Sequence, residues 1–193
     1  MACTISTRCS ANFWDKSDGP PPRKGQVPRK GTVVVIVMGT TGAGKTTIGT
    51  TLAAQLNWEF ADADTFHPPA NIEKMSHGTA LNDADRAPWL EAMRMAILKW
   101  IAAGENVVLA CSALKRAYRD ELRPSPEVKI VYLKGDYALF AERIRQRHGH
   151  FAGEGILAGQ FADLEEPTDA ITIDAAKSLE QIVAEIRKRL WLS

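Results

Sequence analysis

Short apolar runs alternate with longer stretches of helical periodicity from residue 32 onward. The runs are rich in Val and Ile, which is typical of strands buried on both faces of a sheet. They predict strands at residues 32–38, 58–61, 106–111, 128–133 and 170–173. The periodic stretches predict helices at residues 45–56, 69–77, 85–103, 115–122, 137–147, 156–166 and 178–190. Strands and helices that alternate in this way predict an α/β fold, with a five-stranded parallel sheet and helices on both faces.

A glycine-rich segment follows the first expected strand directly. It fits the pattern G-x-x-x-x-G-K-[ST] of a phosphate-binding P-loop, as Gly39-Thr40-Thr41-Gly42-Ala43-Gly44-Lys45-Thr46. In such a loop, backbone N–H groups and the start of the next helix surround a phosphate. Lys45 would reach the β- and γ-phosphates of a nucleoside triphosphate, and the Thr46 hydroxyl would bind Mg²⁺. The alternative is a glycine-rich turn that binds nothing, which the strand before it and the helix after it disfavour.

Polar side chains also follow the second and third expected strands. Asp62 and Asp64 lie two positions apart at the end of the second strand, which predicts that both side chains point the same way. Ser112, Lys115 and Arg116 follow the third strand. Because ligands bind at the carboxyl ends of strands in such sheets, we expect these groups to line one crevice with the P-loop. The carboxylates would supply a metal contact and a base for phosphoryl transfer, unless they only end a strand or cap a helix.

The overall composition narrows the class of protein. The 193 residues are 45% hydrophobic and 24% charged, as in an ordinary globular domain. The net charge is +1, but residues 1–31 carry six Lys or Arg against two Asp, so the remainder is slightly acidic and argues against a nucleic-acid-binding surface. No apolar run is long enough to cross a membrane. A GTPase switch or motor is disfavoured, because the chain has no Asn-Lys-x-Asp motif and no Asp directly after the third strand.

The first 31 residues differ in character from the rest. They contain Gly-Pro-Pro-Pro, repeated Lys and Arg and little periodicity, which predicts a disordered basic leader at 1–31 ahead of a domain at 32–193. Cys3, Cys9 and Cys111 are scattered without metal-ligand spacing, which favours a reducing compartment and hence the cytoplasm. The first dozen residues carry Ser, Thr and Arg but no acid, so organelle targeting by the leader stays an alternative.

Four longer segments resemble the gluconokinases, small P-loop kinases related to shikimate and nucleoside monophosphate kinases. They are GTTGAGKTTIGTTLAAQL, FADADTFHPPANIEKMSHGTALNDADRAPWL, VVLACSALKRAYRDELR and RIRQRHGHFAGEGILAGQFADLEEP. The resemblance implies a P-loop kinase fold with a lid segment at about residues 148–158. It implies ATP-dependent phosphorylation of D-gluconate at the 6-hydroxyl, with Mg²⁺, to give 6-phospho-D-gluconate and ADP for the pentose phosphate pathway. Kinases of this type are often homodimers, and the oligomeric state here stays open.

The resemblance also implies a role for each matched position. ATP would be bound by Gly39, Thr40, Thr41, Gly42, Ala43, Gly44, Lys45, Thr46, Thr47 and Arg143. The metal would be held by Thr46 and, through water, by Asp62. The catalytic residues would be Lys45, Asp64 as the base and Arg147 as the lid arginine, although which of Asp62 and Asp64 is the base stays open. The substrate would be bound by Asp64, His67, Arg86, Ser112, Lys115 and Arg116.

Several of these assignments have a plainer alternative. Arg86 would bind the gluconate carboxylate through its planar fork, but an ion pair with Asp83 or Asp85, or a contact at the helix N-terminus, would also explain it. Lys115 and Arg116 would equally suit solvated helix positions, and His67 a packing role.

Two rival functions also remain. One is a kinase of the same fold that acts on another small acid such as shikimate, and the other is a catalytically silent nucleotide-binding module.

Overall fold

A single parallel sheet forms the centre of the molecule. The computed structural model describes residues 31–148 and 152–190, so the expected leader lies outside the described residues except for Gly31. The strands are β1 (Val34–Met38), β2 (Glu59–Asp62), β3 (Val107–Ala110), β4 (Val128–Lys134) and β5 (Ile171–Asp174). They pair in parallel in the order β2-β3-β1-β4-β5. The expected five-stranded parallel sheet is confirmed.

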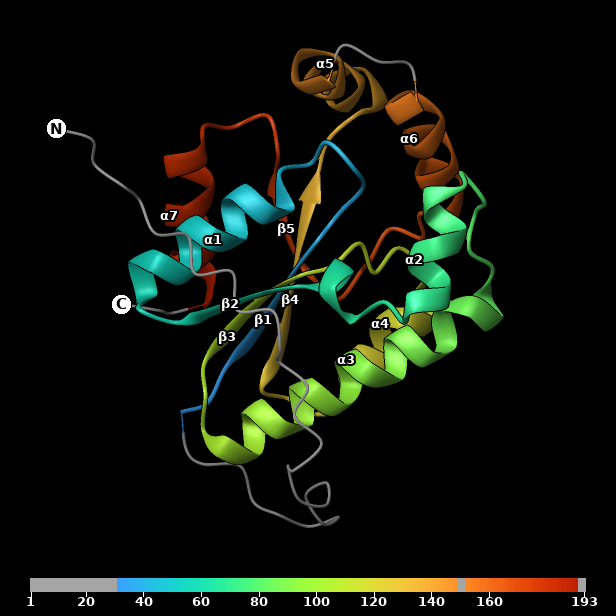
Figure 1. The fold of residues 1–193 in the computed structure, drawn as a ribbon. Coiled ribbons are helices and arrows are strands. Elements are labelled where there is room, and N and C mark those ends of the chain that lie inside the picture. The colour runs from blue at the N-terminus through green and yellow to red at the C-terminus, as the bar shows by residue number, and fades with distance from the viewer. Residues whose placement is uncertain (1–30, 149–151, 191–193) are drawn as a thin grey trace, which may run out of the picture.

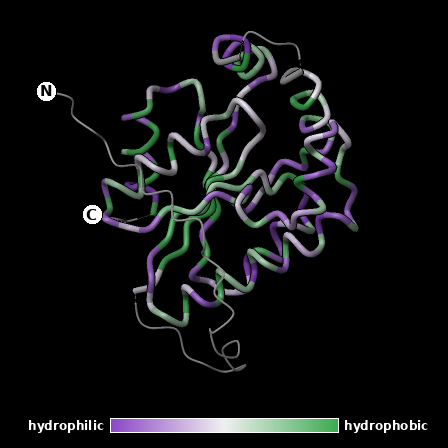
Figure 2. Tube along the Cα trace, in the orientation of Figure 1, coloured by the Kyte–Doolittle hydropathy of each residue, from purple (hydrophilic) through white to green (hydrophobic). Residues whose placement is uncertain are grey.

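Helices cover both faces of this sheet (Figure 1). They are α1 (Lys45–Leu56), α2 (Pro69–Ser76), α3 (Asp83–Ala103), α4 (Arg116–Leu122), α5 (Tyr137–His148), α6 (Ala152–Asp163) and α7 (Leu179–Leu190), with a 3₁₀ turn η1 (Ala63–Phe66). One hydrophobic core lies between the sheet and α3 and α4, and a second lies between the sheet and α1, α5 and α7. Figure 2 shows the most hydrophobic stretches in the strands at the centre. Ligands can therefore reach the sheet only at the ends of its strands, as in other parallel sheets.

The central strand β1 sets the position of the P-loop. All five residues of β1 are buried, and the strand lies between β3 and β4. The loop Gly39–Gly44 leaves the carboxyl end of β1 and leads directly into α1. A strand with neighbours on both sides and helices on both faces fixes the point from which the loop departs.

Most element boundaries differ from the expected ones by one or two residues, and three of the differences bear on the site. α3 begins at Asp83 because Asn82 and Asp85 form a capping box, in which each side chain accepts a hydrogen bond from the other residue's backbone N–H. β2 continues through Asp62 and then turns into η1, so Asp64 lies in a 3₁₀ turn and not on the strand. α6 begins at Ala152, although its first turns contain Gly153 and Gly155. Leu157, which is fully buried, anchors that helix in the second core.

Candidate active site

The P-loop adopts backbone angles that favour glycine. Gly42 has φ of 81°, and a Cβ added there would lie 2.9 Å from the carbonyl oxygen of Phe140. Gly44 has φ of 90° and occupies the cap position before α1. The loop therefore requires glycine at Gly42, both for its backbone angle and for its close approach to α5. This geometry leaves the first N–H groups of α1 directed into the loop, where an anion can accept hydrogen bonds from them.

Lys45 and Thr46 connect the P-loop to the end of β2. The Lys45 ammonium donates a hydrogen bond to the carbonyl of Thr40 at 3.0 Å. Burial lowers the pKa of Lys45, while the nearby carboxylates of Asp64 and Asp62 act in the opposite direction. The Thr46 hydroxyl donates to Oδ2 of Asp62 at 3.1 Å. The structure thus brings together the P-loop and both predicted carboxylates, and Thr46 and Thr47 are both exposed at the start of α1.

The two carboxylates have different surroundings. Asp62 accepts hydrogen bonds at both oxygens, from the Thr46 hydroxyl and from the backbone N–H of Asp64. The Asp64 side chain is exposed and accepts no hydrogen bond from any of the described residues. The turn that carries them is fixed from α3, because the Trp89 indole donates to the carbonyl of Ala63 at 2.8 Å. One carboxylate is therefore held in place beside Thr46, and the other is open to a ligand.

His67 stacks on the same tryptophan. Its ring lies parallel to that of Trp89, at an interplanar angle of 4° and a centroid distance of 4.8 Å. Burial lowers the pKa of His67, and the charge of Arg86 acts in the same direction against that of Asp64. His67 is therefore within reach of the charges of both Asp64 and Arg86. Its main contact is a packing contact, which was the plainer of its two expected roles.

Arg86 lies in a polar cluster formed by α3, α4 and α6. Its guanidinium donates to the Tyr118 hydroxyl at 3.3 Å and lies 3.9 Å from Asp83 and 3.8 Å from Asp163. Lys115 donates to Asp83 at 2.8 Å, and the Tyr118 hydroxyl donates to Asp83 as well. Those hydrogen bonds lower the pKa of Asp83 and raise that of Lys115. The pairing of Arg86 with Asp83 is thus present but long, and the guanidinium keeps donors for a further partner.

The loop between β3 and α4 carries the remaining acceptor-side residues. Ser112 is half-buried there, next to Ala113, whose φ is 44°. Arg119 is almost fully buried and donates to the carbonyls of Ala113 and Leu114, which holds this unusual turn. Arg116 faces away, because its side chain is 81% exposed and pairs with Asp120 on its own helix. The structure therefore brings Ser112 and Lys115 to the site, but not Arg116.

Of the two arginines expected near the lid, the structure describes the side chain of Arg143 only. Arg143 donates to the carbonyl of Ala175 at 2.7 Å and so links α5 to the segment after β5. The side chain of Arg147 and residues 149–151 of the expected lid lie outside the described part of the chain. Of the expected lid, His148 ends α5 and residues 152–158 belong to α6.

Sequence reasoning missed two polar residues of α6. Gln160 accepts a hydrogen bond from the backbone N–H of Thr41 in the P-loop at 2.6 Å. Asp163 contributes one of the two carboxylates near Arg86. Neither lies in a local pattern that signals a contact with a residue so distant in the sequence, and only the general expectation of a lid pointed to this region.

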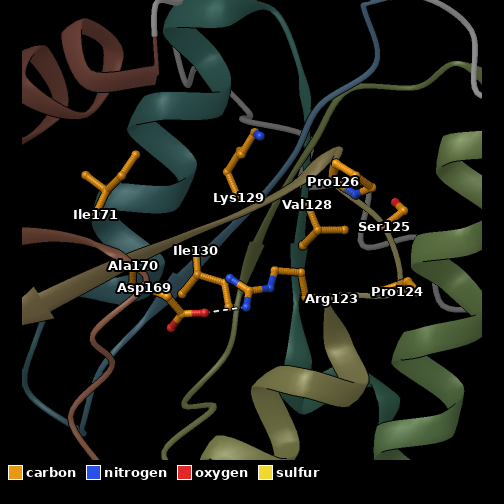
Figure 3. A pocket seen from close by; sticks show the side chains of 10 residues that line it. All are labelled: Arg123, Pro124, Ser125, Pro126, Val128, Lys129, Ile130, Asp169, Ala170 and Ile171. Carbon is orange, nitrogen blue, oxygen red and sulfur yellow. Dashed lines mark hydrogen bonds and ion pairs between the residues drawn. The ribbon is translucent and has the colours of Figure 1, made fainter.

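A separate hollow on the surface lies at the opposite ends of the strands from the P-loop. It has a volume of about 640 Å³ and is bounded by the amino ends of β4 and β5. Figure 3 shows Arg123 and Asp169 paired across it. The P-loop and the Asp62–Asp64 turn lie at the carboxyl ends of the strands, so this hollow is separate from the candidate active site.

The described residues contain no group of three or more His, Cys, Asp or Glu side chains suited to a metal ion. A divalent ion at Thr46 and Asp62 would therefore need ligands from the substrate or from water. Within residues 31–148 and 152–190, no helix is long and apolar enough to cross a membrane.

Comparisons with known proteins agree with this geometry. The family model described as shikimate kinase matches residues 41–191. A gluconokinase from Gluconobacter oxydans is 42% identical over 156 residues, which cover 79% of this chain and 88% of that protein. The thermoresistant gluconokinase of Escherichia coli is 40% identical over 156 residues, covering 78% and 89% of the two chains.

A solved structure extends the match to three dimensions. The crystal structure of a gluconokinase from Sinorhizobium meliloti is 37% identical, with a TM-score of 0.71, and the match covers 82% of this chain and 95% of that one. The P-loop kinase fold expected from the sequence is confirmed, and so is the expected family. This chain belongs to the shikimate kinase family of P-loop kinases and, within it, to the gluconokinases.

Proposed function

We propose that this kinase transfers the γ-phosphoryl group of ATP to the 6-hydroxyl of D-gluconate, giving 6-phospho-D-gluconate and ADP. The observation that carries the proposal is the meeting of the P-loop with the β2 carboxylates, through the 3.1 Å hydrogen bond from Thr46 to Asp62. A phosphate donor on the P-loop would then face the exposed carboxylate of Asp64. Donor site and base are the two parts that transfer to a hydroxyl requires.

The donor side fits ATP with a magnesium ion. The P-loop N–H groups and Lys45 would bind the phosphates, and the lid region with Arg147 would supply further positive charge. Thr46 and Asp62 present two oxygen atoms beside each other, a set that suits Mg²⁺, because this ion usually binds one or two protein oxygens together with phosphates and water. When bound, the ion would neutralise developing negative charge on the phosphates. Arg143, through its contact with the segment after β5, would help to fix the nucleotide side of the site.

The acceptor side fits a small polyhydroxy acid. Arg86 would bind the substrate carboxylate, since a guanidinium can donate two parallel hydrogen bonds to it. Asp64 would accept the proton from the attacking hydroxyl. Ser112 and Lys115 would contact hydroxyl groups along the chain of the acid, and His67 would shape the wall between Asp64 and Arg86. Arg116 has no place in this scheme, because its side chain faces solvent on α4.

The proposal is tested by coupled measurement of ADP release with Mg-ATP and a panel of acceptors. The panel contains D-gluconate, shikimate, glucose and nucleoside monophosphates. We expect turnover with D-gluconate alone. Turnover with shikimate instead would overturn the proposed acceptor, and turnover with glucose, which has no carboxylate, would also overturn the assignment of Arg86. The variant Arg86→Ala should raise KM for D-gluconate much more than KM for ATP. An equal rise in both would assign Arg86 to folding.

We place the reaction in the cytoplasm, where its product enters the pentose phosphate pathway. The scattered cysteines support a reducing environment. Cys111 is buried at the end of β3, and burial raises the pKa of its thiol to about 12, so it stays protonated and unreactive. Gel filtration with light scattering would decide whether the active form is a homodimer.

A further inference from the structure

Helix α6 contacts both halves of the candidate active site. Gln160 accepts a hydrogen bond from a P-loop N–H, and Asp163 lies beside Arg86. The two residues are three positions apart and therefore lie on the same face of the helix. This one face thus spans the site from the donor side to the acceptor side.

The contact at the P-loop resembles the contact that a phosphate would make. The side-chain oxygen of Gln160 accepts from the backbone N–H of Thr41 at 2.6 Å, and the side chain is half-buried. The next residue, Phe161, packs edge-on against Tyr137 and tilted against Phe140, both from α5. Phe140 in turn supplies the backbone oxygen that approaches Gly42. α6 is therefore held against the P-loop by an oxygen atom and by aromatic packing.

Asp163 places a carboxylate beside Arg86, close to where a substrate carboxylate would bind. The Asp163 carboxylate lies 3.8 Å from the Arg86 guanidinium, with side chains 43% and 26% exposed. That distance is too long for a hydrogen bond, and the Asp83 carboxylate is equally distant at 3.9 Å. Arg86 is thus surrounded by carboxylates without being saturated by either. A ligand carboxylate at hydrogen-bond distance would interact more strongly than Asp163 does.

The end of α6 is anchored to the acceptor-side loop. The backbone N–H of Glu165 donates to the carbonyl of Leu114, and the Glu165 carboxylate accepts from the N–H of Arg116 at 2.6 Å. The chain beyond Asp163 therefore stays beside Ser112 and Lys115 when side-chain contacts of α6 change. Asp163 is the last residue of α6, so a rotation of the helix at this end turns the Asp163 side chain while Glu165 stays in place.

We propose that α6 is an internal occupant of both substrate sites, with Gln160 in the place of a phosphate oxygen and Asp163 in the place of the acceptor carboxylate. Each substrate displaces the residue that occupies its own site, and the helix links the two displacements. Nucleotide binding therefore releases Asp163 from Arg86 and strengthens acceptor binding, and the reverse holds to the same factor. The acceptor half of this inference rests on the proposed function, and the donor half does not.

The test is a set of calorimetric titrations on the full chain. D-gluconate is titrated alone and with a saturating non-hydrolysable ATP analogue and Mg²⁺. In the unmodified protein we expect the analogue to tighten D-gluconate binding about two- to fivefold, the range for one exposed ion pair. Asp163→Asn should bind D-gluconate that much more tightly without nucleotide, and the analogue should then add little.

Gln160→Ala gives the sharper result. The changed residue lies at the donor site, yet the variant should tighten D-gluconate binding in the absence of nucleotide. The reason is that losing the hydrogen bond to Thr41 frees the same helix that carries Asp163. It should also tighten binding of the analogue alone. Glu91→Gln is the control for Asp163, as an exposed carboxylate 3.6 Å from an arginine on α3. Gln146→Ala is the control for Gln160, as an exposed amide bonded to Glu142. Both controls should bind as the unmodified protein does.

The outcomes separate the two proposals. If Asp163→Asn and Gln160→Ala bind their ligands as before or more weakly, with unchanged thermal midpoints, α6 is a support and the inference is overturned. If the unmodified protein binds the analogue but not D-gluconate, the proposed acceptor is wrong. In that case tighter analogue binding by Gln160→Ala upholds the donor half of the inference, and unchanged binding overturns it.

Discussion

At the scale of single residues, the two carboxylates after β2 differ in what already binds them. Both oxygens of Asp62 accept hydrogen bonds, one from the Thr46 hydroxyl, whereas the Asp64 carboxylate is exposed. A group that must accept a proton from a substrate needs a free oxygen, and a group that positions a metal needs to be held. The geometry therefore favours Asp64 as the base and Asp62 as the metal partner, the choice that their sequence spacing left open.

Asp64→Asn should keep nucleotide binding and lose most turnover. The amide has the same shape but cannot take the proton, so we expect kcat to fall about 10²- to 10⁴-fold. Steady-state ADP release gives kcat, and calorimetry with an ATP analogue gives nucleotide affinity. Glu59→Gln, at the other end of β2, is a matched change of an exposed carboxylate and should have no effect. Near-normal turnover in Asp64→Asn would assign proton transfer to another group.

The half-buried position of His67 predicts a pH dependence of stability. Burial lowers its pKa below the usual 6.5, so the unfolded chain takes up the proton first as the pH falls. Its contribution to the free energy of unfolding is therefore complete above pH 6.5 and is lost as the pH falls from there to the lowered pKa. Urea unfolding at a series of pH values measures this. His67→Phe keeps a ring against Trp89 and should show a shallower fall, and parallel curves for the two proteins would contradict the prediction.

At the scale of elements, the P-loop depends on its contact with α5. Gly42→Ala places a methyl group 2.9 Å from the Phe140 carbonyl at a φ of 81°, so something must shift. We expect the free energy of unfolding to drop by about 1–3 kcal/mol and nucleotide affinity to fall with it. Urea unfolding and calorimetry measure the two effects. Gly159→Ala is the control, because a Cβ there has open space on α6, and alanine should stabilise that helix slightly. Equal effects of the two changes would count against a strained loop.

The sequence predicts elements better than it predicts the contacts between them. Buried parallel strands leave apolar runs, and a P-loop is a local pattern, so all five strands and the P-loop between β1 and α1 could be predicted. The position of Asp64 could not, because β2 turns into η1 and the alternation of a strand stops there. Gln160 and Thr41 are 119 positions apart, and Arg143 and Ala175 are 32 apart, so no local pattern marks these pairs. They arise only when α5 and α6 pack beside the sheet.

At the scale of the whole molecule, the site joins segments from both hydrophobic cores. The P-loop and α1 pack into one core, while the Asp62–Asp64 turn, Trp89 and Tyr118 belong to the other. The hydrogen bond from Thr46 to Asp62 crosses between them at the carboxyl ends of the strands. A ligand that binds there holds both layers and is bound only by the folded chain. Ligand binding should therefore be visible as global stability.

Mg-ATP analogue at about one hundred times its Kd should raise the free energy of unfolding by about 2.7 kcal/mol. For a chain of this length that corresponds to a rise in Tm of about 5–10 °C. The part of the rise that EDTA removes is the contribution of Mg²⁺. Asp62→Asn should lose much of that part and keep the rise given by nucleotide alone, because the P-loop N–H groups and Lys45 remain. Glu91→Gln should keep both. An unchanged Mg²⁺-dependent rise in Asp62→Asn, measured by calorimetric unfolding, would mean that the ion is held through Thr46 and the phosphates without this carboxylate.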